Sequence, residues 1–307
     1  MASTASLRAR ALSLTLRCTV RPIISLWALA PGLPWPYGVV DHAGRLAHRP
    51  CGTRFTPVDL GHARAQWVDP ADEATDRVIL YLHGGAFLVG GWHLHRGMVG
   101  HLAARARARV LMVEYRKLPR HSLLDASADA LDAYRLLLSE GIAPQRIVVM
   151  GDSAGGFLAL LLAAHLSEAG LPRPAGLVAL SPLLDLDPTP GEGRGCAVLT
   201  PRAVSALARA SRVGAAELLT PMTTSGHHLP PTLIQSGLGE TLHRQAVAYA
   251  EALAELGVPH ELQLWPVDIH VFQAARWLPE AREAWDRVVD FLDALASTYS
   301  GVASADA

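Results

Sequence analysis

The sequence predicts an α/β protein in which a mostly parallel central sheet is covered by helices on both faces. Short runs rich in Val, Ile and Leu recur along the chain, and helical stretches separate most of them. Two parallel strands joined through a helix need a right-handed crossover, which packs the helices against the sheet. With 307 residues, of which 50% are hydrophobic, the chain is long enough for one large domain with a sizeable core.

Six apolar runs are predicted to be buried parallel strands, because each is short, continuous and rich in β-branched residues. They span residues 77–82, 109–115, 146–150, 176–181, 232–237 and 261–267, and helices are predicted near 126–139, 154–168, 241–256 and 280–297. Residues 56–68 differ, since two strand-like stretches flank Gly61 there. That pattern is typical of an antiparallel hairpin at a sheet edge.

One interval breaks the alternation of strands and helices. Residues 187–195 read DPTPGEGRG, and the alternation resumes only near Pro231. An interval of this length exceeds an ordinary connection between two elements of a sheet. The sequence therefore predicts either a cap over a functional site or a mobile loop in this region.

The first 35 residues mix short apolar pieces with basic side chains, namely Arg8, Arg10, Arg17 and Arg21. Each apolar piece is too short to span a bilayer, and Pro22 and the arginines interrupt the pattern of a secretory signal. We therefore expect a basic amphipathic segment that packs on the protein's own surface. Contact with a membrane surface is the alternative, though it is not expected.

Charge and cysteine content exclude several classes of protein. The 27 basic and 28 acidic residues nearly cancel, so no nucleic-acid partner is expected. Cys18, Cys51 and Cys196 are odd in number and widely spaced, which fits neither a disulfide framework nor a zinc site. A reducing, cytoplasmic location is the expectation that follows.

The stretch RIVVMGDSAGGFLALLLAAHL contains one serine in a G-x-S-x-G pattern, with Gly151 and Gly155 on either side of Ser153. An apolar strand precedes the pattern and an Ala/Leu-rich helix follows it, as in a nucleophile elbow. Glycine is needed at such a turn because side chains at the flanking positions would collide. The alternative is an ordinary Gly-rich turn with Ser153 as a helix cap, or a phosphate cradle, but the P-loop lysine is absent.

Two adjacent glycines, Gly84 and Gly85, follow the strand predicted at 77–82 in the sequence HGGAF. Their backbone N–H groups, together with that of Ala154, are predicted to form an oxyanion hole. A simple β-turn is the alternative, since paired glycines are common in turns.

A base and an acid for Ser153 are expected further along the chain. His270 follows the last predicted strand, and Glu240 lies in a loop between a strand and a helix, which gives the order serine, acid, histidine. Asp185 and Asp187 are the alternative acids. Asp268 is too close to His270 in sequence to face its ring easily.

The motifs HGGAF, GDSAGG, PPTLIQSG followed by Glu240, and IHVFQ together resemble the hormone-sensitive-lipase-like family of bacterial esterases, over roughly residues 77–295. The resemblance implies an α/β-hydrolase fold, a single domain over 1–307 with helical cap elements from about 1–45 and 188–228, and a homodimer. Two positions depart from the family pattern. Arg244 stands where a second acid is usual, and Arg120 replaces a glutamate after the strand that follows HGG.

The function predicted for the chain is hydrolysis of carboxylic esters through an acyl-enzyme, without a cofactor or metal. The family resemblance implies short to medium acyl chains. Trp35, Phe87 and Trp92 are candidate walls of an apolar substrate pocket. His93 and His95 lack a third metal ligand and are interpreted as surface or pocket-rim side chains. An amidase, deacetylase or lactonase on the same residues, and a non-catalytic hydrolase-like binding protein, are the alternatives.

Overall fold

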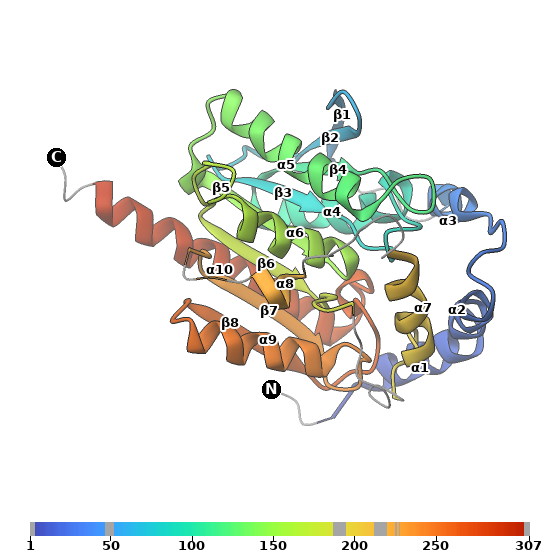
Figure 1. Ribbon diagram of the computed structural model, residues 1–307. Coiled ribbons are helices and arrows are strands. Elements are labelled where there is room, and N and C mark those ends of the chain that lie inside the picture. The colour runs from blue at the N-terminus through green and yellow to red at the C-terminus, as the bar shows by residue number, and fades with distance from the viewer. Residues whose placement is uncertain are drawn as a thin grey trace.

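Eight strands form one sheet in the order β1-β2-β4-β3-β5-β6-β7-β8 (Figure 1). The structure, a computed structural model, describes residues 4–46, 52–186, 195–211, 220–224, 226 and 228–303. β1 is antiparallel to β2, β2 is antiparallel to β4, and all remaining neighbours are parallel. The strands are β1 Arg54–Asp59, β2 Arg64–Asp69, β3 Val78–Leu82, β4 Arg109–Glu114, β5 Ile147–Asp152, β6 Gly176–Leu180, β7 Thr232–Gly237 and β8 His260–Trp265.

The predicted α/β fold with a mostly parallel sheet is confirmed, and so is the hairpin around Gly61. The α-helices are α1 Leu7–Cys18, α2 Val20–Leu29, α3 Tyr37–Ala43, α4 Trp92–Ala106, α5 Leu123–Ser139, α6 Ala154–His165, α7 Pro201–Ser211, α8 Pro221–Thr224, α9 His243–Glu255 and α10 Pro279–Ala303. Short 3₁₀ turns lie at η1 Gly44–Leu46, η2 Pro144–Arg146 and η3 Phe272–Ala274.

Helices cover both faces of the sheet, and the alternation of side chains along β3 shows how. Val78, Leu80 and Leu82 pack into the core shared with α5, α6 and α9. Ile79 and Tyr81 point to the opposite face and pack into the core shared with α4 and α10. Because successive side chains of a strand face opposite ways, a strand buried on both faces is apolar throughout.

Helix α4 is the main element that the sequence patterns did not predict. Its sequence, WHLHRGMVGHLAARA, contains two glycines and three histidines, which weaken intrinsic helix propensity. Burial of Met98, Val99 and Leu102 against the sheet stabilises the helix instead. Tertiary packing therefore overrides local propensity in this crossover.

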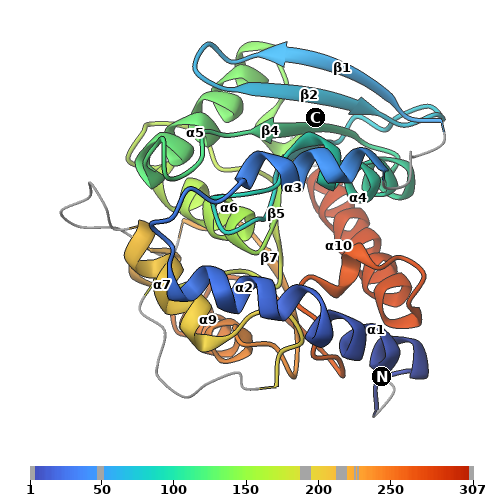
Figure 2. The ribbon, with the colours of Figure 1, turned by 90° about the vertical axis from the view of Figure 1, so that its right-hand side faces the viewer.

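Helices α1, α2 and α7 lie together on the side of the sheet where the parallel strands end, and Figure 2 views that side directly. Ala28 of α2 packs with Ala203 and Ala206 of α7, so two segments far apart in sequence contact each other. The two apolar pieces that are separately too short to span a bilayer form one helical stretch, Leu7–Leu29. By length and composition alone this stretch is long enough to cross a membrane.

Candidate active site

Ser153 lies at the turn between β5 and α6 with φ 51° and ψ −117°. This left-handed backbone is strained for a residue with a side chain and persists only where surrounding structure enforces it. A Cβ atom at Gly155 would overlap the carbonyl group of Leu82, and one at Gly151 would overlap the carbonyl group of Gly155. Glycine at these two positions therefore allows α6 to begin in close contact with the end of β3. The sequence predicted such collisions for any larger residue at Gly151 and Gly155.

A chain of hydrogen bonds links Ser153, His270 and Glu240. The Oγ of Ser153 lies 2.8 Å from Nε2 of His270, and Nδ1 of His270 lies 2.7 Å from Oε2 of Glu240. His270 comes from the loop after β8, and Glu240 comes from the loop between β7 and α9. The side chain of Glu240 is fully buried and that of His270 is 8% exposed, so water hardly competes for these bonds.

Ser181 is a member of this network that the sequence patterns did not single out. Its Oγ donates to Oε1 of Glu240 at 2.7 Å and accepts a bond from the N–H of Val271 at 3.2 Å. The N–H of Gly237 also donates to Oε1 of Glu240, at 2.7 Å. Ser181 and Gly237 therefore orient the carboxylate of Glu240, and its other oxygen pairs with His270. The only feature of the sequence that could have indicated a role for Ser181 is its position directly after β6.

Asp268, which the sequence does not predict to face His270, has other partners, and Asp185 and Asp187 are the alternative acids. The carboxylate of Asp268 accepts hydrogen bonds from Ser13 at 2.8 Å and from Arg17 at 2.6 Å, not from His270. Asp185 follows β6, and its backbone N–H contacts the Gln245 side chain at 3.3 Å. Asp187 lies outside the described residues.

The prediction for Gly84 is wrong. Its N–H donates to Oδ1 of Asp152 at 2.9 Å, so this donor is already occupied. The Asp152 carboxylate is buried immediately before Ser153 and also accepts the hydroxyl of Tyr81 at 2.7 Å. It thus joins the loop after β3 to the turn that carries Ser153.

The backbone after Gly84 turns sharply, with φ values of 119° at Gly85, 58° at Ala86 and 56° at Phe87. Within the described part of the chain, the N–H groups of Gly85 and Ala86 have no acceptor. The N–H of Ala154, at the first position of α6, lies before the start of the helical hydrogen-bond ladder. The N–H of Ala86 is therefore a candidate oxyanion donor that the paired-glycine signal overlooked, because alanine carries no sign of a left-handed backbone.

Burial sets the ionisation of the polar side chains beneath this loop. Although burial opposes the charge of Asp152, the nearby His95 and the hydrogen bonds from Tyr81 and Gly84 hold the pKa of its carboxyl below the usual value. Burial, reinforced by His95, lowers the pKa of His83 well below its usual value, so His83 is neutral near pH 7. These side chains form a buried polar layer that supports the loop.

His93 and His95 do not converge on one point. Nε2 of His93 accepts from Arg45 at 3.0 Å, whereas Nε2 of buried His95 faces Oδ2 of Asp152 at 3.7 Å. The interpretation of His95 as a surface or rim residue is therefore wrong. Among the residues that the structure describes, no group of three or more His, Cys, Asp or Glu side chains is arranged to hold a metal ion.

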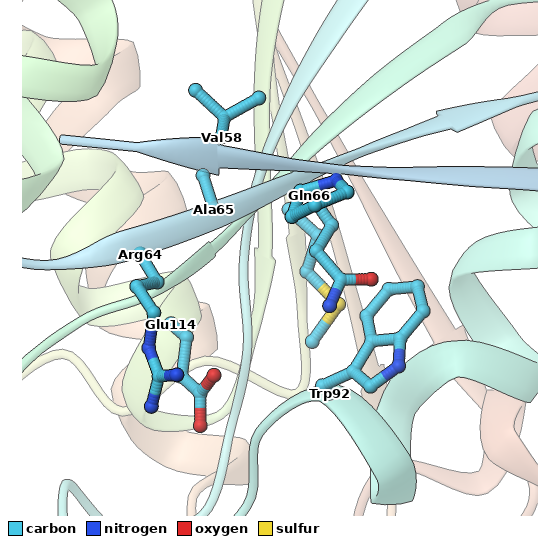
Figure 3. A pocket seen from close by; sticks show the side chains of 8 residues that line it. Val58, Arg64, Ala65, Gln66, Trp92 and Glu114 are labelled. Carbon is cyan, nitrogen blue, oxygen red and sulfur yellow. The ribbon is translucent and has the colours of Figure 1, made fainter.

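Two of the three predicted pocket walls lie elsewhere. Phe87 is fully buried and packs edge-on against Phe157 in the core, with ring centroids 5.5 Å apart. Trp92 packs edge-on against Phe55 and lines a cavity beneath the β1–β2 hairpin, beside Gln66 in Figure 3. Neither Ser153 nor His270 lines that cavity. Trp35 is partly buried, and its indole N–H donates to the carbonyl of Ala30 at 2.8 Å.

Comparison with known proteins shows which proteins the chain resembles. A family model for the alpha/beta hydrolase fold matches residues 79–274. Esterase LipU of Mycobacterium tuberculosis is 40% identical over 89% of this chain and 98% of its own, and Carboxylesterase/phospholipase LipF of that organism is 39% identical over 94% and 82%. A solved esterase from the bacterial hormone-sensitive lipase family has a TM-score of 0.78 at 30% identity, covering 88% of this chain and 96% of its own.

Proposed function

The chain belongs to the hormone-sensitive-lipase-like family of the α/β-hydrolase fold and is a serine hydrolase of carboxylic esters, and we propose that Ser153, His270 and Glu240 are its catalytic triad. The observation that carries this proposal is the continuous hydrogen-bonded path from Ser153 Oγ through His270 to Glu240. Each bond has the length that proton transfer between such groups requires.

In the proposed reaction, Ser153 Oγ attacks the ester carbonyl carbon while its proton passes to Nε2 of His270. The tetrahedral intermediate then collapses, the carbon–oxygen bond to the alcohol breaks, and the alcohol leaves with the proton from His270. Water attacks the resulting acyl-enzyme with His270 again as base, which releases the acid and restores Ser153. Glu240 accepts the Nδ1 proton of His270 and stabilises the imidazolium formed in each step.

We assign the oxyanion hole to the N–H groups of Gly85, Ala86 and Ala154. The occupied amide of Gly84 is replaced by that of Ala86 in this assignment. Support comes from the left-handed turn at Gly85 and Ala86, whose amides have no acceptor among the described residues. It also comes from the start of α6, where the helix dipole favours negative charge. Donors fixed in this way stabilise the charge that develops on the carbonyl oxygen.

The proposed substrates are esters with short to medium uncharged acyl chains, as the family resemblance implies. Helices α1, α2 and α7 over the strand ends support a cap that limits the length of the acyl chain (Figure 2). The cap assignment for 1–45 and 188–228, Trp35 as a pocket wall, the homodimer and the cytoplasmic location stay predictions.

A p-nitrophenyl ester series from acetate to palmitate tests the proposal. We expect kcat/KM to peak at short or medium chains, and we expect Ser153→Ala to lower it by roughly 10⁴-fold or more. Labelling of Ser153 by a fluorophosphonate probe checks the nucleophile independently of the substrate chosen. A folded native protein that is neither active nor labelled would favour the non-catalytic binding protein, and labelling without activity on these esters would favour a narrower acyl substrate.

A further inference from the structure

The helices α1 and α2 expose a row of large apolar side chains to solvent. Leu7, Leu14, Ile23, Leu26 and Leu29 are between 58% and 82% exposed, and we name this set the N-terminal apolar face. Large exposed side chains scattered singly need no explanation, but a contiguous apolar surface marks an interaction site. Both helices run across the same side of the molecule (Figure 2).

The opposite side of α1 is fixed to the protein. The backbone N–H and Oγ of Ser6 donate to the carboxylate of Glu280 at 2.6 and 3.0 Å, and Oγ of Ser13 donates to Asp268 at 2.8 Å. Ala9 is buried in the core cluster that contains Trp265. A helix packed along one side in this manner lies on the surface of the domain, and only its outer side is accessible to a binding partner.

Positive charge borders the apolar row. At 100° per residue, Leu7 and Leu14 point the same way, and Arg8 and Arg10 lie on opposite flanks of that row. Residues 1–46 contain five arginines and one acidic residue, Asp41, although the whole chain has a formal net charge of −1. Half-exposed Trp277 lies beside α1, since its carbonyl accepts from Arg8 at 3.4 Å.

We propose that the N-terminal apolar face docks on an anionic lipid surface, with α1 and α2 lying in the plane of the headgroups. An apolar row between two basic flanks, with a tryptophan at its edge, is the composition of an interfacial helix. Leucine side chains enter the acyl boundary, while Arg8 and Arg10 remain among the anionic headgroups. A second copy of the chain on this face would instead bring like charges together, which is why the charges favour lipid.

The N-terminal apolar face and the proposed active site lie on the same side of the sheet. α1 and α2 lie on the side where the parallel strands end (Figures 1 and 2). Ser153 directly follows β5 and His270 follows β8, so both residues belong to loops at these strand ends. Docking would therefore turn the proposed active site toward the lipid, where apolar esters concentrate. The inference goes beyond the proposed function, because lipid binding needs neither the triad nor turnover.

Flotation with vesicles tests the proposal in the full chain carrying Ser153→Ala, so that no lipid is consumed. Vesicles of equal parts phosphatidylglycerol and phosphatidylcholine should carry the protein upward, and phosphatidylcholine alone should carry less. Leu14→Ser combined with Leu26→Ser should weaken the partition about tenfold or more, because two large apolar groups leave the interface. Arg8→Gln with Arg10→Gln should weaken it roughly tenfold and reduce its dependence on salt.

Matched variants on α5 serve as controls. Leu124 is 56% exposed and Arg135 is also exposed, yet both lie outside the N-terminal apolar face. Leu124→Ser and Arg135→Gln should therefore partition like the parent. The proposal is overturned if the parent protein does not float with anionic vesicles, or if the serine variants on α1 and α2 float as well as the parent. Dimerisation that these variants abolish, without flotation of the parent, would assign the face to a second copy.

Discussion

Arg17 donates to the carboxylate of Asp268 at 2.6 Å, and Asp268 lies two residues before His270. Helix α1 is thereby tied to the loop that carries the proposed general base, across most of the length of the chain. Arg17 also donates to the carbonyl of Gly195, so a single guanidinium joins three segments that are distant in sequence.

Arg17→Ala should lower the free energy of unfolding by about 1 kcal/mol, since both side chains of the ion pair are only about 30% exposed. It should also lower kcat several-fold, because the His270 loop loses a restraint. Urea unfolding in a double-mutant cycle with Asp268→Ala should give a coupling energy of at least about 0.5 kcal/mol. Arg135→Ala, which removes an exposed pair with Asp132, is the control, and additive effects of Arg17 and Asp268 would contradict the prediction.

Ser181→Ala should lower kcat by roughly tenfold or more while KM changes little. The substitution removes a hydrogen bond to a buried carboxylate, and such bonds contribute about 1.5–3 kcal/mol. Ser181 is a positioning residue, because it acts through Glu240. Steady-state kinetics on p-nitrophenyl butyrate would measure the split between kcat and KM.

Ser236→Ala is the matched control for that experiment. Ser236 is buried in β7, and its Oγ has no hydrogen-bond partner in the described part of the chain. Its removal should leave kcat within about twofold of the native value, since no bond to the network is lost. Equal losses in the two variants would mean that the Ser181 effect comes from packing and not from orientation of Glu240.

Gly155→Ala should prevent folding or lower the free energy of unfolding by at least about 3 kcal/mol. The new methyl group would overlap the backbone carbonyl of Leu82, and neither α6 nor β3 can move without disturbing the core. Gly38→Ala in α3, where a Cβ meets nothing within 4 Å, should be neutral or stabilise slightly. Thermal melts compare them, and a native-like melting temperature for Gly155→Ala would refute the close approach of α6 to β3.

The partly buried histidine His101 predicts a loss of stability at acid pH. Burial, with help from Arg276 and Arg105, lowers its pKa from 6.5 to about 4. Between these values the unfolded chain binds a proton that the folded chain does not, so the free energy of unfolding decreases as pH falls from 6.5 to about 4.

Urea unfolding at pH 7 and pH 5 would measure this effect. His101→Gln should lose less stability than the native protein over that range, because it has no proton to bind there. His62→Gln, a substitution in the exposed turn of the β1–β2 hairpin, should lose as much as the native protein. An identical pH dependence in the native protein and His101→Gln would contradict the assignment.

The sequence by itself determined those helices, strands and turns whose conformation depends only on neighbouring residues. Strand β5, the turn at Ser153 and helix α6 follow from an apolar run, two glycines and an Ala/Leu-rich stretch that are contiguous in the chain. The positions of the parallel strands along the chain, and the chain order serine, acid, histidine, likewise follow from short contiguous motifs. Such patterns are informative because backbone sterics and side-chain periodicity act over a few residues.

Only the tertiary structure decided which polar groups meet. The sequence offered Gly84 as an oxyanion donor, but the fold brings Asp152 to its amide, 68 residues away. The sequence also predicted Phe87 as a wall of the substrate pocket, but close packing buries its ring against Phe157. Ser181 joined Glu240 without a motif of its own. Contacts of this kind depend on the spacing of strands in the sheet and on the packing of α6 against it, and no short stretch of sequence contains that information.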